Sequence, residues 1–111
     1  MARNCHKAVY HAVYLMELQT EYLYPEQTEF GIQGSIAPEQ VQRMLEQYPG
    51  TQAILLTSPT YDGVVSDIAA IAEIVHAHQI PLIVDEAHGA HFGFSERFPK
   101  KGDFLWCGSV Y

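Results

Sequence analysis

The stretch Leu82–Phe94 (LIVDEAHGAHFGF) decides the fold of this chain. Three apolar residues follow Pro81 and end at Asp85, which is typical of a buried parallel strand that carries one acid at its carboxyl end. Ligands of open α/β sheets bind outside this end of the strands. Asp85 is therefore the first candidate for a functional carboxylate, and a purely structural role for it remains the alternative.

Helical and strand-like patterns alternate along the rest of the chain. Short connections between such elements favour right-handed crossovers and a parallel sheet. We expect helices over residues 4–16 with Asn4 as N-cap, from Ala37 to before Pro49, and from a Ser66-Asp67 cap to before Gln79. We expect strands over residues 21–24, 53–57 and 82–84, and the start of another strand at residues 104–107.

The fold class that follows is α/β, with a mostly parallel sheet and flanking helices. The chain has 111 residues and no internal repeat or linker, so we treat residues 1–111 as a single domain. The loops at residues 58–63 and 85–94 follow two neighbouring strands. They should lie at the same edge of the sheet, where one ligand would be near both.

Composition and charge exclude several classes of partner. The net charge is −7, with 13 acidic residues against 6 Lys and Arg, and no basic stripe favours a nucleic-acid partner. No apolar run approaches the ~20 residues of a membrane span, and the first residues do not have the pattern of a secretory signal. Cys5 and Cys107 do not form a disulfide framework, so we expect a cytoplasmic protein.

Two local motifs have alternative interpretations. The letters at residues 85–88 spell the DEAH signature of helicases, but the sequence lacks the Gly-x4-Gly-Lys-Ser/Thr phosphate loop that such a nucleotide site needs. His88 and His91 are separated by two residues, which is not the spacing of a helical zinc pair, so we expect no metal site. A third interpretation concerns Asp85, whose carboxylate could bind an aromatic nitrogen ring. A carboxylate in a low-dielectric site favours the protonated form of a pyridine, which then acts as an electron sink.

Three segments together carry a family resemblance. Residues 4–12 (NCHKAVYHA), 57–68 (TSPTYDGVVSDI) and 84–92 (VDEAHGAHF) resemble the large domain of the Orn/Lys/Arg decarboxylases, in the family's order and spacing. The resemblance covers roughly residues 2 to 100. It implies a pyridoxal-phosphate (PLP) enzyme with the aspartate-aminotransferase-like fold. This chain would then be a partial large domain of the PLP-dependent transferase fold.

The resemblance also implies roles for individual residues. Asp85 would pair with the pyridine nitrogen of the cofactor, His6 would stack on its ring, and Ala87 would lie against the other face. His88 would line the site near cofactor and substrate, and Asp85 and His88 are the candidates for catalysis. Ser58 and Thr60 would reach the ring hydroxyl or the substrate, although these two side chains could instead bond the backbone of their own turn.

The family's chemistry also needs a lysine that forms the Schiff base with the cofactor aldehyde. In a gapless comparison with the family pattern Tyr111 takes that position, and Lys100 and Lys101 precede the expected strand. The tail at residues 104–111 diverges from the pattern, and the Gly/Ser/Thr-rich phosphate turn is not recognisable. We therefore expect a fragment of a decarboxylase that is inactive alone.

The resemblance implies a parent enzyme that acts on lysine, ornithine or arginine, and its sites form between subunits of a dimer. A homo-oligomer is therefore the expected assembly. Two alternatives stay open: a non-catalytic scaffold or interaction module, and a piece of another PLP enzyme such as an aminotransferase.

Overall fold

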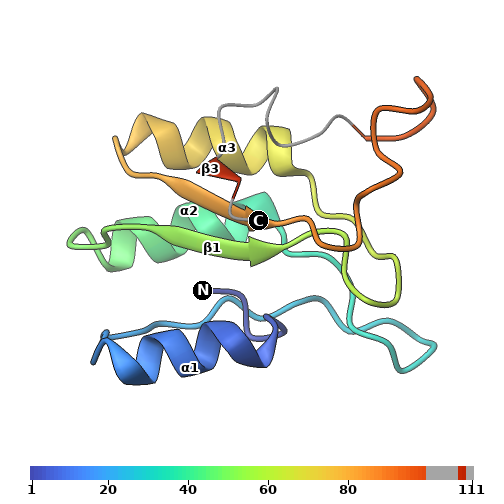
Figure 1. Cartoon of the computed structure of the whole chain (residues 1–111). Coiled ribbons are helices and arrows are strands. Elements are labelled where there is room, and N and C mark those ends of the chain that lie inside the picture. The colour runs from blue at the N-terminus through green and yellow to red at the C-terminus, as the bar shows by residue number, and fades with distance from the viewer. Residues whose placement is uncertain (100–107, 110–111) are drawn as a thin grey trace.

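The computed structural model describes residues 1–99 and 108–109. The order of elements is α1 (Lys7–Leu15), α2 (Pro38–Gln47), β1 (Ile54–Thr57), α3 (Ile68–Ala77), β2 (Leu82–Asp85) and β3 (Gly108–Ser109). The three strands form one sheet in the order β1-β2-β3, and both pairings are parallel (Figure 1). The predicted α/β class with a parallel sheet is confirmed.

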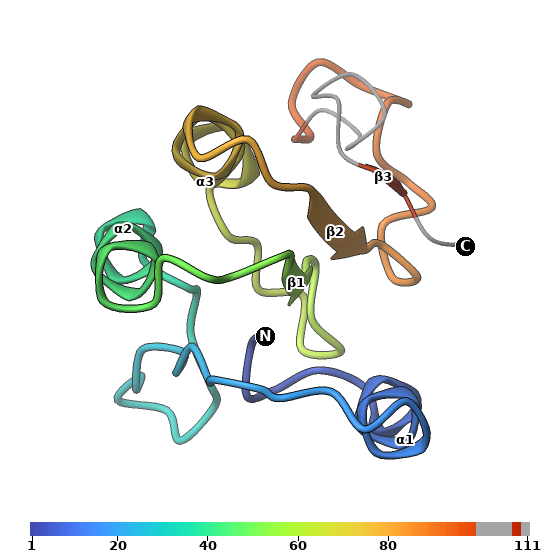
Figure 2. The same cartoon turned by 90° about the vertical axis from the view of Figure 1, so that its left-hand side faces the viewer.

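The two faces of the sheet have different surroundings. Helices α2 and α3 lie on one side of the sheet, and α1 lies on the other (Figure 2). Burial alternates along β1 and β2, as a strand period of two requires. The buried positions face α2 and α3, and the half-buried positions alternate with them. The buried strand residues are Ile54, Leu56, Leu82 and Val84.

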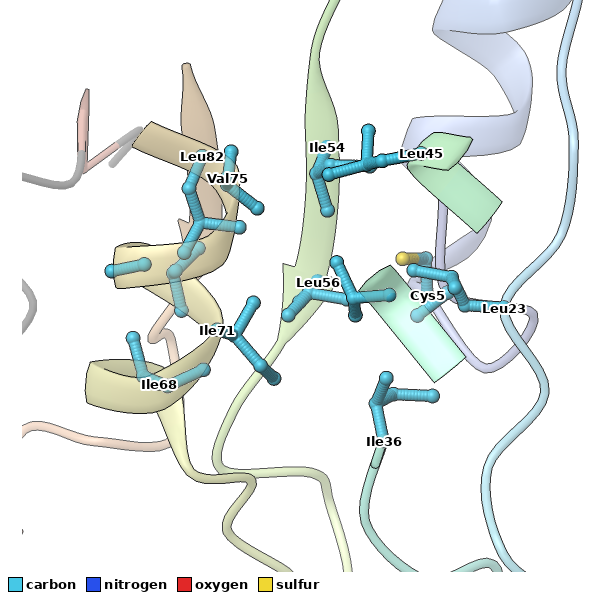
Figure 3. Packing of buried hydrophobic residues seen from close by; sticks show 14 residues of the cluster. Cys5, Leu23, Ile36, Leu45, Ile54, Leu56, Ile68, Ile71, Val75 and Leu82 are labelled. Atoms are coloured by element: carbon cyan, nitrogen blue, oxygen red, sulfur yellow. The ribbon is translucent and has the colours of Figure 1, made fainter. Parts of the chain in front are cut away.

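The hydrophobic core joins these strand residues to the two helices that cover them. Val41 and Leu45 of α2, and Ile71 and Val75 of α3, contribute the inward faces. Leu56 has no exposed surface and lies in the middle of the labelled side chains of the cluster (Figure 3). The helical spacing of three and four residues predicted these inward positions correctly.

The bounds of most elements agree with the sequence patterns. Pro38 occupies the first turn of α2, and the Asp67 side chain caps α3 by accepting from the Ala70 N–H at 3.0 Å. Strand β2 extends one residue beyond the predicted end at Val84, because the Ser58 N–H donates to the Asp85 carbonyl at 3.1 Å. The strand start predicted at residues 104–107 lies outside the described residues.

The start of the first helix was predicted wrongly. The N-cap is His6 rather than Asn4, and the His6 Nδ1 accepts from the Ala8 N–H at 3.1 Å. The cause is tertiary, because the Ala2 N–H donates to the Leu55 carbonyl at 2.9 Å and holds the first residues beside β1. The strand predicted at residues 21–24 is reduced to a single parallel bridge between Ala2 and Leu23.

None of the helices in the described part of the chain combines the length and the apolar character needed to cross a bilayer.

Candidate functional site

The loops that follow β1 and β2 leave the sheet at the same edge, on the right-hand side of Figure 1. The Tyr61 and His88 rings meet edge to face, with centroids 5.6 Å apart. A Cβ added at Gly89 would lie only 3.1 Å from Pro59 Cδ, so the two loops are in close contact. The expectation that residues 58–63 and 85–94 lie together is confirmed.

Asp85 ends β2 and is half-buried. Its Oδ1 accepts from the Ala87 N–H at 3.0 Å, which orients the carboxylate at the carboxyl end of the strand. Within residues 1–99 and 108–109, Asp85 makes no ion pair that would neutralise this charge. A carboxylate oriented by a backbone donor, with its second oxygen available, can receive a protonated ring nitrogen.

His6 follows Cys5 in the chain, and Cys5 is the residue that contacts β1. Cys5 is 8% exposed, and its thiol donates to the Leu55 carbonyl of β1 at 3.9 Å. The ring of His6 is exposed and its Nδ1 is engaged in the cap of α1, which leaves Nε2 to carry the ring hydrogen. The structure therefore places His6 beside a residue that is itself near Asp85, and no hydrogen bond joins His6 to Asp85 in the described part of the chain.

The remaining predicted site residues lie on the two loops. Ala87 and His88 are exposed beside Asp85. Ser58 is 1% exposed and its Oγ accepts from the Ser66 N–H at 3.1 Å, while Thr60 Oγ1 accepts from the Val64 N–H at 3.1 Å. Both hydroxyls thus bond the backbone of their own loop, as the structural alternative anticipated. Each still has its own O–H to donate, so their contact with a cofactor stays a prediction.

The two histidines considered for a metal have aromatic neighbours. His88 contacts Tyr61, and His91 lies edge to face with Phe92 and Phe98, at centroid distances of 4.8 and 5.0 Å. The described residues contain no group of three His, Cys, Asp or Glu side chains arranged to hold a metal ion.

An open depression of about 440 Å³ lies beside the N-terminus of α3. Ser58, Ser66 and Phe92 line it, whereas neither Asp85 nor His6 does. The carboxylate is therefore presented at the edge of the sheet rather than inside this depression.

Cys5 and Thr57 are members of the site that the sequence analysis missed. Burial raises the pKa of the Cys5 thiol, and the negative charge of Asp85 raises it further, whereas the nearby Thr57 hydroxyl and the amino terminus favour the thiolate. Thr57 is the residue of β1 whose Cα pairs with that of Asp85 in β2. The only signal in the sequence was that Thr57, like Asp85, ends an apolar run; the register that pairs these two residues is tertiary.

The electrostatic link between Cys5 and Asp85 can be measured without a ligand. In a Cys107→Ser background, the reaction of Cys5 with a thiol reagent should reach half its limiting rate at a pH above the ordinary range of cysteine. Asp85→Asn removes a negative charge and should lower this midpoint, while Asp62→Asn, on the exposed part of the neighbouring loop, serves as the control. An unchanged midpoint in Asp85→Asn would place the carboxylate too far away to act on Cys5.

Comparison with known proteins finds relatives of this chain. The chain is 41% identical over 98 residues to the Bacillus subtilis protein named "Uncharacterized protein YaaO", and the match covers 87% of this chain and 20% of that protein. It is 36% identical over 98 residues to an arginine decarboxylase of the same bacterium, with the same coverage. The chain thus spans about one fifth of the length of these relatives.

A solved structure shares the fold. The complex of SepCysS with the SepCysE N-terminal domain contains a chain that matches with a TM-score of 0.74 and 19% identity, over 96% of this chain and 28% of that one. The family model described as "Orn/Lys/Arg decarboxylase, major domain" matches residues 1–104. By this match, which spans nearly the whole chain, the chain belongs to the Orn/Lys/Arg decarboxylase family.

Proposed function

We propose that this chain is the part of a PLP-dependent decarboxylase that receives the pyridine nitrogen of the cofactor, in an enzyme acting on lysine, ornithine or arginine. The observation that carries the proposal is the carboxylate of Asp85. It stands at the carboxyl end of β2, it is oriented by the Ala87 N–H, and no ion pair in the described residues occupies it. Such a carboxylate is suited to keep a ring nitrogen protonated.

The surrounding residues fit a flat ring. Ala87 has a small side chain that would let a ring approach, and the exposed imidazole of His6, whose Nδ1 caps α1, would lie against the other face. His88 is exposed on the same loop and would face the substrate side. Ser58 and Thr60 would use their remaining O–H donors toward the ring hydroxyl or the substrate.

When bound, PLP supplies an electron sink for the carbanion formed as carbon dioxide leaves. The role of this chain would be to bind the PLP ring and to orient it. Asp85 would hold a proton at the ring nitrogen, and His6 and Ala87 would contact the ring. The charge of Asp85 thereby makes the ring a stronger electron acceptor than it would be in the neutral form.

Residues elsewhere would complete the reaction. The lysines of this sequence are Lys7, Lys100 and Lys101, and none follows the strand after Asp85 in the family's pattern. We therefore propose that the 111-residue chain binds the ring weakly and does not decarboxylate by itself. We also propose that the protein is cytoplasmic and forms a homo-oligomer, as the family resemblance of the sequence implies.

The proposal predicts selective binding of a pyridine ring. Pyridoxamine phosphate is the suitable probe, because it lacks the aldehyde that would react with lysines and the amino terminus. Calorimetric titration should give saturable binding, at least about tenfold tighter than binding of the carbocyclic analogue that has carbon in place of the ring nitrogen.

The same preparation, supplied with PLP and each of the three basic amino acids, should release no carbon dioxide above a protein-free control. Equal affinity for the pyridine and carbocyclic rings would contradict the proposed role of Asp85. Release of carbon dioxide would contradict the proposal that the isolated chain is inactive.

A further inference from the structure

Thr57 is the last residue of β1 and carries a buried hydroxyl without a partner. Its Oγ1 is shielded from solvent and makes no hydrogen bond of ordinary geometry within the described residues; the Cys5 thiol, whose charged form this hydroxyl favours, is a neighbouring polar group. Buried polar atoms in native proteins are almost always hydrogen-bonded, because leaving one unpaired costs stability. An orphaned hydroxyl therefore indicates a partner outside the part of the chain that the structure describes.

The surroundings of Thr57 identify where that partner would lie. In the parallel register, the Cα of Thr57 pairs with that of Asp85, so the two side chains project from the same face at the carboxyl edge. The Asp85 Oδ1 accepts from the Ala87 N–H at 3.0 Å, and this hydrogen bond leaves the second carboxylate oxygen for another partner. The orphaned hydroxyl and the available carboxylate oxygen are thus neighbours on one face of the sheet.

Cys5 lies near both Thr57 and Asp85, beside Leu55 of β1. It is buried, and its thiol is committed to the Leu55 carbonyl. The thiol is a weak hydrogen-bond donor and acceptor, so it is a poor substitute for a polar partner of Thr57.

We propose that Thr57 is a ligand-contacting residue of the Asp85 site, and that its hydroxyl forms a hydrogen bond with the heteroaromatic ligand that Asp85 holds. This inference rests on the proposed function and adds a residue that the family motifs of the sequence analysis did not single out. The Asp85 carboxylate selects the protonated nitrogen, and the Thr57 hydroxyl fixes how the ring lies in its plane.

The inference is tested with pyridoxamine phosphate and three variants at one position. Thr57→Val keeps the shape of the side chain and removes the hydroxyl, and it should bind the probe about threefold to tenfold more weakly. Thr57→Ser keeps the hydroxyl and should bind within about twofold of the unmodified chain. Thr57→Ala provides a second variant without the hydroxyl in case the valine variant does not fold.

The matched control is Thr51→Val, which removes a hydroxyl that donates to the Tyr48 carbonyl at 2.7 Å, before β1 begins. Its affinity for the probe should not change. Stability supplies a second readout, because Thr57→Val removes an unpaired polar atom and should unfold at the same or a higher urea concentration than the unmodified chain. A purely structural hydroxyl would give the opposite result.

The outcomes separate this inference from the proposed function. If Asp85→Asn weakens binding and Thr57→Val does not, the role of Thr57 is overturned and the proposed function stands. If the serine variant loses as much affinity as the valine variant, or if the valine variant is destabilised, the hydroxyl serves the fold rather than the ligand. If the unmodified chain shows no saturable binding of the probe, both are overturned.

Discussion

Asp85→Asn is expected to weaken the binding of pyridoxamine phosphate by about tenfold to a hundredfold, because a hydrogen bond between charged groups contributes about 1.5–3 kcal/mol. The amide of asparagine has nearly the shape of the carboxylate but carries no charge, so it cannot favour the protonated ring nitrogen. The hydrogen bond from the Ala87 N–H is retained in the variant, because the amide oxygen of asparagine can accept it in place of the Asp85 Oδ1.

The control for this variant is Asp62→Asn, which removes the same charge from an exposed position of the neighbouring loop. Calorimetric titration of both variants should show a loss of affinity in Asp85→Asn alone. Equal losses in the two variants would mean that the net charge of this edge attracts the ligand, and that Asp85 has no specific contact with it.

Leu56→Ala is expected to lower the free energy of unfolding by about 2–5 kcal/mol, the cost of removing a large buried side chain and leaving a cavity. Leu56 has no exposed surface and lies where the sheet meets the core cluster that includes residues of α2 and α3. A loss of this size is a large fraction of the stability of a small domain, which is about 5–15 kcal/mol.

The adjacent residue provides a matched control. Leu55 projects from the other face of β1 and is only half-buried, so Leu55→Ala should lower the free energy of unfolding by much less. Leu56→Val gives a graded change in case the alanine variant does not fold. Urea unfolding followed by circular dichroism provides the comparison, and equal effects at both positions would show that the two faces of β1 are equally buried.

Local patterns predicted the elements that their own residues stabilise. The run Leu82–Val84 contains only apolar residues and indicated a buried parallel strand; β2 includes it, with Leu82 and Val84 buried and Ile83 half-buried. The inward face of α3, with Ile71 and Val75, was visible in its spacing, and its cap at Asp67 was visible in its residue type.

Patterns failed where a distant segment competes for the backbone. The first helix could have begun at Asn4, but the edge of β1 binds the Ala2 N–H, and the helix begins only after His6. Residues 21–24 have strand-forming side chains, yet Leu23 alone is bridged to Ala2. Propensity is a weak preference that tertiary hydrogen bonds override.

The candidate site divides in the same way. Asp85 was recognisable because a buried apolar run ends in an acid, and family motifs drew attention to His6, Ala87 and His88. Cys5 and Thr57 were not recognisable. Thr57 lies beside Asp85 because of the register between β1 and β2, and Cys5 comes near Asp85 because the start of the chain folds back onto β1; neither contact can be read from neighbouring residues in the sequence.

By itself, the sequence determined the α/β class, the alternating elements and the acid at the end of β2, because these depend on the periodicity of neighbouring side chains. Only the tertiary structure decided which groups surround that acid. The parallel pairing of Thr57 with Asp85 and the anchoring of Cys5 on Leu55 are long-range contacts, and such contacts form when separate segments bury their surfaces together.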